Sequence, residues 1–195
     1  MRRFLLNKVA IAVALGSTFI AGQTLAQGYQ VDEQSAKRLG DAFSGGAAEA
    51  EDASTVFYNP AGLVRIQKRQ VVANVSAIIA DAEFEGTSTT VANIPITGSK
   101  ADASSTALVP TVYMAFPVNE DFVFGLSLTA PYATGTEFDS DNVGRYMATE
   151  SSITGINFGY GFGARIMPSL SIGMTLNMQY VSAVNEAAIN LSGAC

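Results

Sequence analysis

Apolar and polar residues alternate strictly along several stretches of this 195-residue chain. A period of two is typical of a β-strand whose two faces meet different surroundings. The clearest example covers residues 122–130, where Phe, Leu and Ala occupy every even position. Gly125, Ser127 and Thr129 lie between them. This stretch therefore predicts a strand with one apolar face and one face that is polar or bare, and neither face carries a charge.

We predict five such strands, at residues 71–80, 108–118, 122–130, 154–163 and 170–180. Their apolar faces run for about 9 to 11 residues, the length with which a tilted strand crosses a bilayer. Long polar loops at 85–107 and 135–150 alternate with short turns at 119–121 and 167–169. Bacterial outer-membrane barrels have this alternation of loop length. The fold class is therefore predicted to be all-β, a transmembrane antiparallel β-barrel. The alternative is a secreted β-sandwich, whose polar faces would carry many Lys and Glu.

The N-terminus has the pattern of a secretory signal peptide. Arg2, Arg3 and Lys8 form a basic region, residues 9–20 are apolar, and small residues follow up to Ala26. An apolar run of 12 residues is short of the roughly 20 that a spanning helix needs. We therefore expect residues 1–26 to be removed as a signal peptide, with cleavage after Ala26.

The charged residues argue against several classes of function. Without residues 1–26 the chain has 8 basic and 17 acidic side chains, a net charge of −9. Such a surface offers no basic patch for nucleic acid. The chain has no His and one Cys, so zinc sites, His-based catalytic triads and an internal disulfide framework are unsupported. We expect no enzymatic activity, no metal and no cofactor.

Residues 28–69 are rich in Ala, Gly and Ser and lack the alternation of the later segments. One or two helical turns are predicted at 35–43, ending at the following glycine pair. Asn59 suits a helix N-cap and Pro60 the first helical position, so a short helix is predicted at 59–66. The apolar content of this segment is too small for a core of its own. It must therefore dock against another part of the protein.

The ordered motifs of this segment resemble those of the long-chain fatty acid outer-membrane transporters of the FadL/TodX type. The likeness extends over essentially the whole chain after residue 26, and "LTAPYATGTEF" at 128–138 is similar to the family's third strand. The motif residues are Tyr29, Ser35, Gly40, Phe43, Ser44, Gly45, residues 50–53, Asn59, Pro60 and Ala61.

The resemblance implies a 14-stranded barrel whose lumen is plugged by an N-terminal hatch. Residues 27–69 would form the hatch, with Asn59, Pro60, Ala61 and Gly62 as its motif, and residues 70–195 the first five strands. Five strands do not close a membrane barrel, so we expect the chain to be the N-terminal part of a longer protein. Family members pass hydrophobic compounds by diffusion, with lateral exit at a kink in the third strand.

Pro131 interrupts the third predicted strand, and proline is tolerated only at strand edges and bulges. We hypothesise that Pro131, Tyr132 and Gly135 form the kink at the lateral opening. The alternative is that Pro131 ends the strand at the membrane rim. Lys37 or Arg38 could attract a carboxylate head group, or each could be an ordinary charge of the hatch or the periplasmic surface.

Three functions remain open at this point. The first is passive transport of long-chain fatty acids across the outer membrane of a Gram-negative bacterium. The second is the same route for aromatic or alkane hydrocarbons, and the third is a structural or adhesive barrel without transport. Expected partners are hydrophobic small molecules, outer-membrane lipid and lipopolysaccharide, with no nucleic acid and a monomeric barrel.

Overall fold

The computed structural model describes residues 30–89, 95–98 and 100–189. The expected signal peptide at 1–26 and Cys195 lie outside these residues, as do the first residues of the expected hatch.

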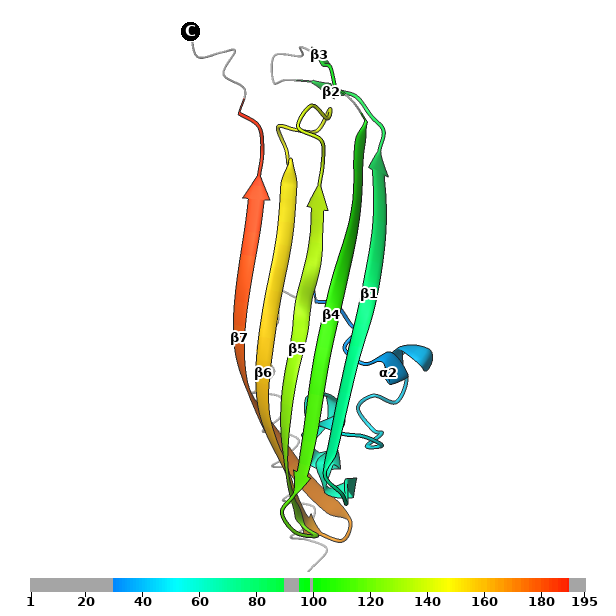
Figure 1. The fold of residues 1–195 in the computed structure, drawn as a ribbon, viewed down its shortest axis with the longest axis vertical. Coiled ribbons are helices and arrows are strands. Elements are labelled where there is room, and N and C mark those ends of the chain that lie inside the picture. Colours follow the sequence, from blue (N-terminus) through cyan, green and yellow to red (C-terminus); the bar gives the residue numbers. More distant parts are fainter. Residues whose placement is uncertain (1–29, 90–94, 99, 190–195) are drawn as a thin grey trace, which may run out of the picture.

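Five long strands form one antiparallel sheet in the order β1-β4-β5-β6-β7 (Figure 1). Two short strands pair in a separate hairpin. Short turns connect the strands at one end of the sheet and longer connections lie at the other, as predicted. The strands are β1 (Gln70–Phe84), β2 (Ser88–Thr89), β3 (Pro95–Ile96), β4 (Ala101–Pro117), β5 (Phe122–Glu137), β6 (Glu150–Met167) and β7 (Leu170–Glu186).

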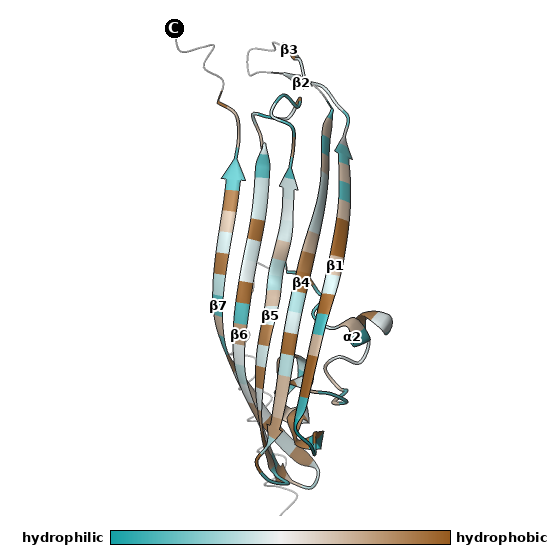
Figure 2. Cartoon of the chain, viewed as in Figure 1, coloured by the Kyte–Doolittle hydropathy of each residue, from teal (hydrophilic) through white to brown (hydrophobic). Residues whose placement is uncertain are grey.

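The two faces of the sheet differ as the alternation predicts. Large apolar side chains point away from the N-terminal segment, which is residues 30–69 of the described chain, and they are exposed, with Ile79 at 79%, Leu176 at 63% and Tyr180 at 73% of their surface. Figure 2 shows apolar residues as brown bands along the strands, separated by more polar ones. A soluble protein would bury such a surface, whereas a bilayer solvates it. We refer to the opposite face, which the N-terminal segment covers, as the inner face.

The strands are longer than the alternation indicated. Residues 101–107 were predicted as loop but form the first part of β4, paired with β1 down to Phe84↔Ala101. In "ADASSTA" both faces are small or polar, so the period-2 contrast disappears although the ladder continues. β5 likewise runs through Pro131 to Glu137. The alternative in which Pro131 ends the strand is therefore wrong.

Three short helical elements lie in the described part of the N-terminal segment. Helix α2 (Ala36–Gly40) begins after Ser35, whose Oγ accepts from the Arg38 N–H at 3.5 Å. Helix α3 (Thr55–Tyr58) and the 3-10 helix η1 (Pro60–Arg65) follow. None of the helices that the structure describes has the length and apolar content needed to cross a membrane.

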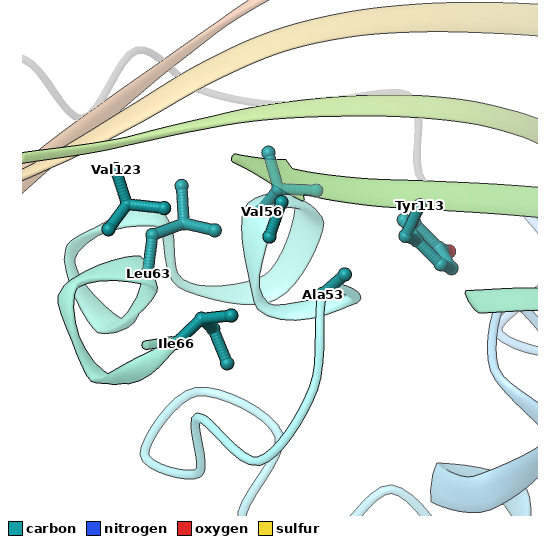
Figure 3. Close-up of a cluster of buried hydrophobic side chains, with 7 residues drawn as sticks. Ala53, Val56, Leu63, Ile66, Tyr113 and Val123 are labelled. Carbon is teal, nitrogen blue, oxygen red and sulfur yellow. The ribbon is translucent and has the colours of Figure 1, made fainter. Parts of the chain in front are cut away.

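Helices α3 and η1 pack against the inner face of the sheet. Val56 and Leu63 are fully buried and meet Val123 of β5 in the main apolar cluster (Figure 3). The close approach of α3 to the sheet requires glycine on the strands, because a Cβ on Gly161 would lie 2.5 Å from Val56 Cγ2. The glycines of the inner face therefore make room for the segment that docks there.

Candidate functional site

A β-bulge interrupts the pairing of β5 with β6 at Pro131. Thr129 pairs with Asn157 and Tyr132 pairs with Gly155, so two residues of β5 face the single Ile156 of β6. A bulge suits proline, which has no N–H to give to the ladder. Because of the extra residue, the side chains that face inward change from odd-numbered positions before the bulge to even-numbered positions after it.

Tyr132 is placed on the inner face by this exchange. Its ring lies over Gly155, where a Cβ would come within 2.8 Å of Tyr132 Cδ2. Of the three residues predicted to form the kink, Pro131 is therefore in the bulge and Tyr132 directly after it. Their role in a lateral opening stays a prediction.

The ladder between β4 and β5 ends beside the bulge. Its last registered pair is Val112↔Leu128, whereas β5 remains paired with β6 as far as Glu137↔Glu150. Pro110 stands on β4 two residues beyond that last pair. Sequence reasoning overlooked Pro110, although a proline within an apolar strand indicates a missing ladder bond. Prolines thus mark both strands where their pairing stops.

Two cavities adjoin the unpaired part of these strands. One, of about 540 Å³, lies on the inner face and is lined by Val31, Ile78 and Ile153 among others. The second, of about 420 Å³, reaches Leu108, whose side chain is 62% exposed on the outer face. They share wall residues of β4, β5 and β6, which are Ser105, Ala107, Ala133, Thr134, Gly135, Thr136 and Ser152. Gly135, the third predicted kink residue, therefore lines both cavities.

The start of the N-terminal segment crosses the bulge. The Val31 N–H donates to Pro131 O at 2.9 Å, and Gln34 Nε2 donates to Ala130 O at 3.1 Å. Val31 also packs against Ala130 and against Val109 of β4. Ala130 and Pro131 have no registered partner in the sheet, and their carbonyl groups accept hydrogen bonds from the N-terminal segment instead.

The motif at 59–62 adopts a different cap from the predicted one. Asn59 precedes η1 and Pro60 is its first residue, but Asn59 makes no side-chain cap hydrogen bond. Its Nδ2 donates instead to Ala47 O at 2.6 Å, which ties two parts of the segment together. The predicted helix at 59–66 is the six-residue 3-10 helix. A Cβ on Gly62 would lie 2.7 Å from Ala50 Cβ, so the glycine permits this close packing.

Pro60 and Ala61 lie directly against the sheet. A Cβ on Gly163 of β6 would lie 2.6 Å from Pro60 O, and one on Gly173 of β7 would overlap the Ala61 nitrogen. Thr175 Oγ1 donates to Val56 O at 2.9 Å beside them. The motif therefore docks on the inner face, at the end of the sheet where the short turns lie.

Lys37 and Arg38 both bind acidic partners within the segment. Lys37 is exposed and pairs with Glu51, whose hydrogen bond raises the lysine pKa. Arg38 is buried, with its guanidinium 3.6 Å from Glu49 Oε2 and 4.6 Å from the centre of the Tyr58 ring. Burial raises the pKa of Tyr58 to about 12, so Arg38 stacks on a neutral phenol. Neither cation lines either of the two cavities beside the bulge.

Comparisons with known proteins all point to one family of outer-membrane proteins. Residues 17–193 match the family model described as outer membrane protein transport protein (OMPP1/FadL/TodX). The long-chain fatty acid transport protein of Escherichia coli K12 is 32% identical over 184 residues, which cover 94% of this chain and 39% of that protein. The 47 kDa outer membrane protein of Pasteurella multocida is 35% identical over 140 residues, covering 71% and 31%.

A solved structure shares the fold as well. The crystal structure of a Pseudomonas aeruginosa FadL homologue superposes with a TM-score of 0.71 at 26% identity. The match covers 80% of this chain and 38% of that one. The chain thus spans about 30–40% of the length of the proteins named here.

Proposed function

Because this chain belongs to the OMPP1/FadL/TodX family of outer-membrane transport proteins, we propose that it carries the exit route of a passive transporter for hydrophobic compounds. In this proposal residues 27–69 are the hatch and residues 70–195 the first five strands of the barrel. A bound compound leaves the lumen sideways, between β4 and β5. The observation that supports this route most directly is the β4–β5 ladder, which stops beside the bulge with a cavity on each side.

The backbone determines the energetic cost of such an interruption. Inside a bilayer each unpaired N–H or C=O group costs several kcal/mol, so a barrel normally keeps its ladders complete. Pro110 and Pro131 have no N–H and lower that cost at the interruption. An interruption built from prolines and lined by small side chains is consistent with a passage that stays open to lipid.

The driving force needs no catalytic residue. Each CH₂ group gains about 0.8 kcal/mol on leaving water for an apolar site. The inner cavity, lined by Val31, Ile78 and Ala107, provides such a site close to the exit. Displacement of the hatch would then change the cavity and release the compound.

We propose long-chain fatty acids as the first substrate class, since the Escherichia coli relative is named for their transport. Aromatic or alkane hydrocarbons are the second candidate. One observation favours them: no lysine or arginine lines either cavity among the residues that the structure describes. The exposed outer face would contact lipid and the lipid part of lipopolysaccharide, and we propose a monomeric barrel.

The test fills the proposed exit in the complete gene product. Ala107 lines both cavities, so Ala107→Trp should obstruct the route. Ala77 on the exposed side of β1 offers the same substitution as a control. We expect uptake of labelled oleate to fall at least fivefold in Ala107→Trp and to be unchanged in Ala77→Trp. Parallel uptake of toluene separates the two substrate classes. Normal folding with no uptake of either compound would instead support a structural or adhesive barrel.

A further inference from the structure

Gln34 occupies a position on the N-terminal segment that links three parts of the protein. Its side chain is 1% exposed, and its Nε2 donates both to Ala130 O in the bulge and to Val31 O, each at 3.1 Å. Its own carbonyl accepts from the Tyr113 phenol of β4 at 2.7 Å. One residue is therefore bonded to the segment, to β5 and to β4, the two strands whose ladder is interrupted.

The direction of the Gln34 amide follows from its surroundings. Both groups within reach of the Nε2 are carbonyl oxygens, which only accept hydrogen bonds. A flipped amide would place Oε1 against them, so the donor must face the bulge. Oε1 then points elsewhere and has no hydrogen-bond partner among the described residues, although it is buried.

The segment held by Gln34 separates two cavities. Val31 lines the inner cavity beside the interrupted ladder and also a third cavity, of about 280 Å³, within the N-terminal segment. Gln34 itself lines this third cavity, together with Phe43, Phe57 and Tyr58. A displaced Gln34 side chain thus has space to enter without unfolding the sheet.

We propose that Gln34 is a latch: its amide holds residues 30–34 across the bulge and keeps the inner cavity closed on the lumenal side. This inference rests on the proposed function, in which that cavity leads to the exit. The unsatisfied Oε1 opposes the closed position, since a buried acceptor without a donor is costly and regains hydrogen bonds in water. The latch is therefore releasable, and the bond from Nε2 to Ala130 O, which joins the segment to β5, controls how often it opens. Gln34 acts as a positioning residue and contributes no contact to the exit itself.

The experiment measures opening without relying on transport. In the complete protein with its native cysteines replaced, Val109→Cys provides a reporter, because Val109 is fully buried and packs against Val31. The rate of modification by a water-soluble maleimide then reports how often the segment lifts. We expect Gln34→Leu to raise this rate about tenfold. Gln67→Leu, an exposed position on the same segment, should leave it within twofold of the parent.

Gln34→Glu adds a readout that a merely structural role would not move. A carboxylate faces the Val31 and Ala130 carbonyls without a proton to donate, so labelling at pH 8 should exceed that of Gln34→Leu. A protonated carboxyl restores one donor, so the excess should shrink at pH 5. Each rate is normalised to Gln67→Leu at the same pH, because the thiol itself titrates.

The outcomes separate the latch from the exit route. If Gln34→Leu and Gln34→Glu label at the control rate while heat-modifiable electrophoretic mobility shows a folded barrel, the latch is overturned. If labelling rises and oleate and toluene uptake both stay at the parental rate, the latch stands and the proposed exit route fails.

Discussion

The phenol of Tyr113 on β4 donates a hydrogen bond to the main-chain oxygen of Gln34, 79 residues earlier in the chain. Both residues are buried, and the bond joins the N-terminal segment to a strand that borders the interrupted ladder. The docking of the segment is therefore physically connected to β4, one of the two strands whose ladder is interrupted.

Tyr113→Phe should loosen the segment without unfolding the sheet. Loss of this bond leaves a buried carbonyl unsatisfied, at a cost of about 1–3 kcal/mol. Amide exchange near Val31 should accelerate by roughly tenfold or more, measured by hydrogen–deuterium exchange with mass spectrometry. Tyr160→Phe on the exposed face is the control. Equal exchange in both variants would contradict the connection.

Gly163→Ala should displace the motif at 59–62. The new methyl group would lie 2.6 Å from Pro60 O and 3.0 Å from Leu63 Cβ, so η1 must move. We expect faster tryptic cleavage at Arg65 and Lys68, with the barrel still folded. Gly40→Ala is the matched control, because nothing lies within 4 Å of its Cβ position. Slow cleavage in both variants would show that η1 does not depend on this approach.

Asn59 can be tested as a donor and as a cap in one comparison. Its amide donates to Ala47 O, so Asn59→Ala should cost about 0.5–1.5 kcal/mol of segment stability. A capping role would be preserved by Asn59→Asp. Asp has no donor at neutral pH, so we expect it to be at least as harmful as Ala in the same proteolysis assay. Rescue by Asp would restore the capping interpretation.

Pro131→Ala supplies the missing N–H at the bulge. We expect the ladder between β4 and β5 to extend beyond Val112↔Leu128, because an unpaired N–H in a bilayer is costly and a hydrogen bond to an acceptor removes that cost. Amide exchange in β4 should slow, and oleate uptake should fall severalfold. Pro117→Ala at the end of β4 is the control. Full uptake with an unchanged strand path would remove Pro131 from the exit route.

The contributions of Arg38 and Lys37 can be distinguished because the two side chains have different partners. Arg38→Met removes a buried cation from Glu49 and Tyr58, and we expect a loss of about 1–3 kcal/mol in segment stability. Lys37→Met breaks only an exposed pair and should change stability by less than about 1 kcal/mol. Oleate and toluene binding by both variants tests carboxylate attraction, which requires oleate affinity alone to fall.

Some features of the fold follow from local pattern. Alternation at 122–130 predicted a strand and identified its exposed face, because side chains on a strand alternate whatever their partners are. Pro131 was recognised as an interruption of the strand, but the sequence left open whether the strand kinks or ends there, and β5 in fact continues through a bulge. The same reasoning failed at residues 101–107, where both faces are polar or small, and it missed Pro110.

The sequence by itself determined that this chain forms an antiparallel sheet with an apolar outer face, and that its N-terminal segment needs a surface on which to dock. Only the tertiary structure decided where the β4–β5 ladder stops, which face Tyr132 occupies, and that Gln34 bonds Ala130. The physical reason is how far apart along the chain the interacting residues lie. Alternation is a property of adjacent residues, whereas register, bulges and buried hydrogen bonds depend on groups that folding brings together from distant positions.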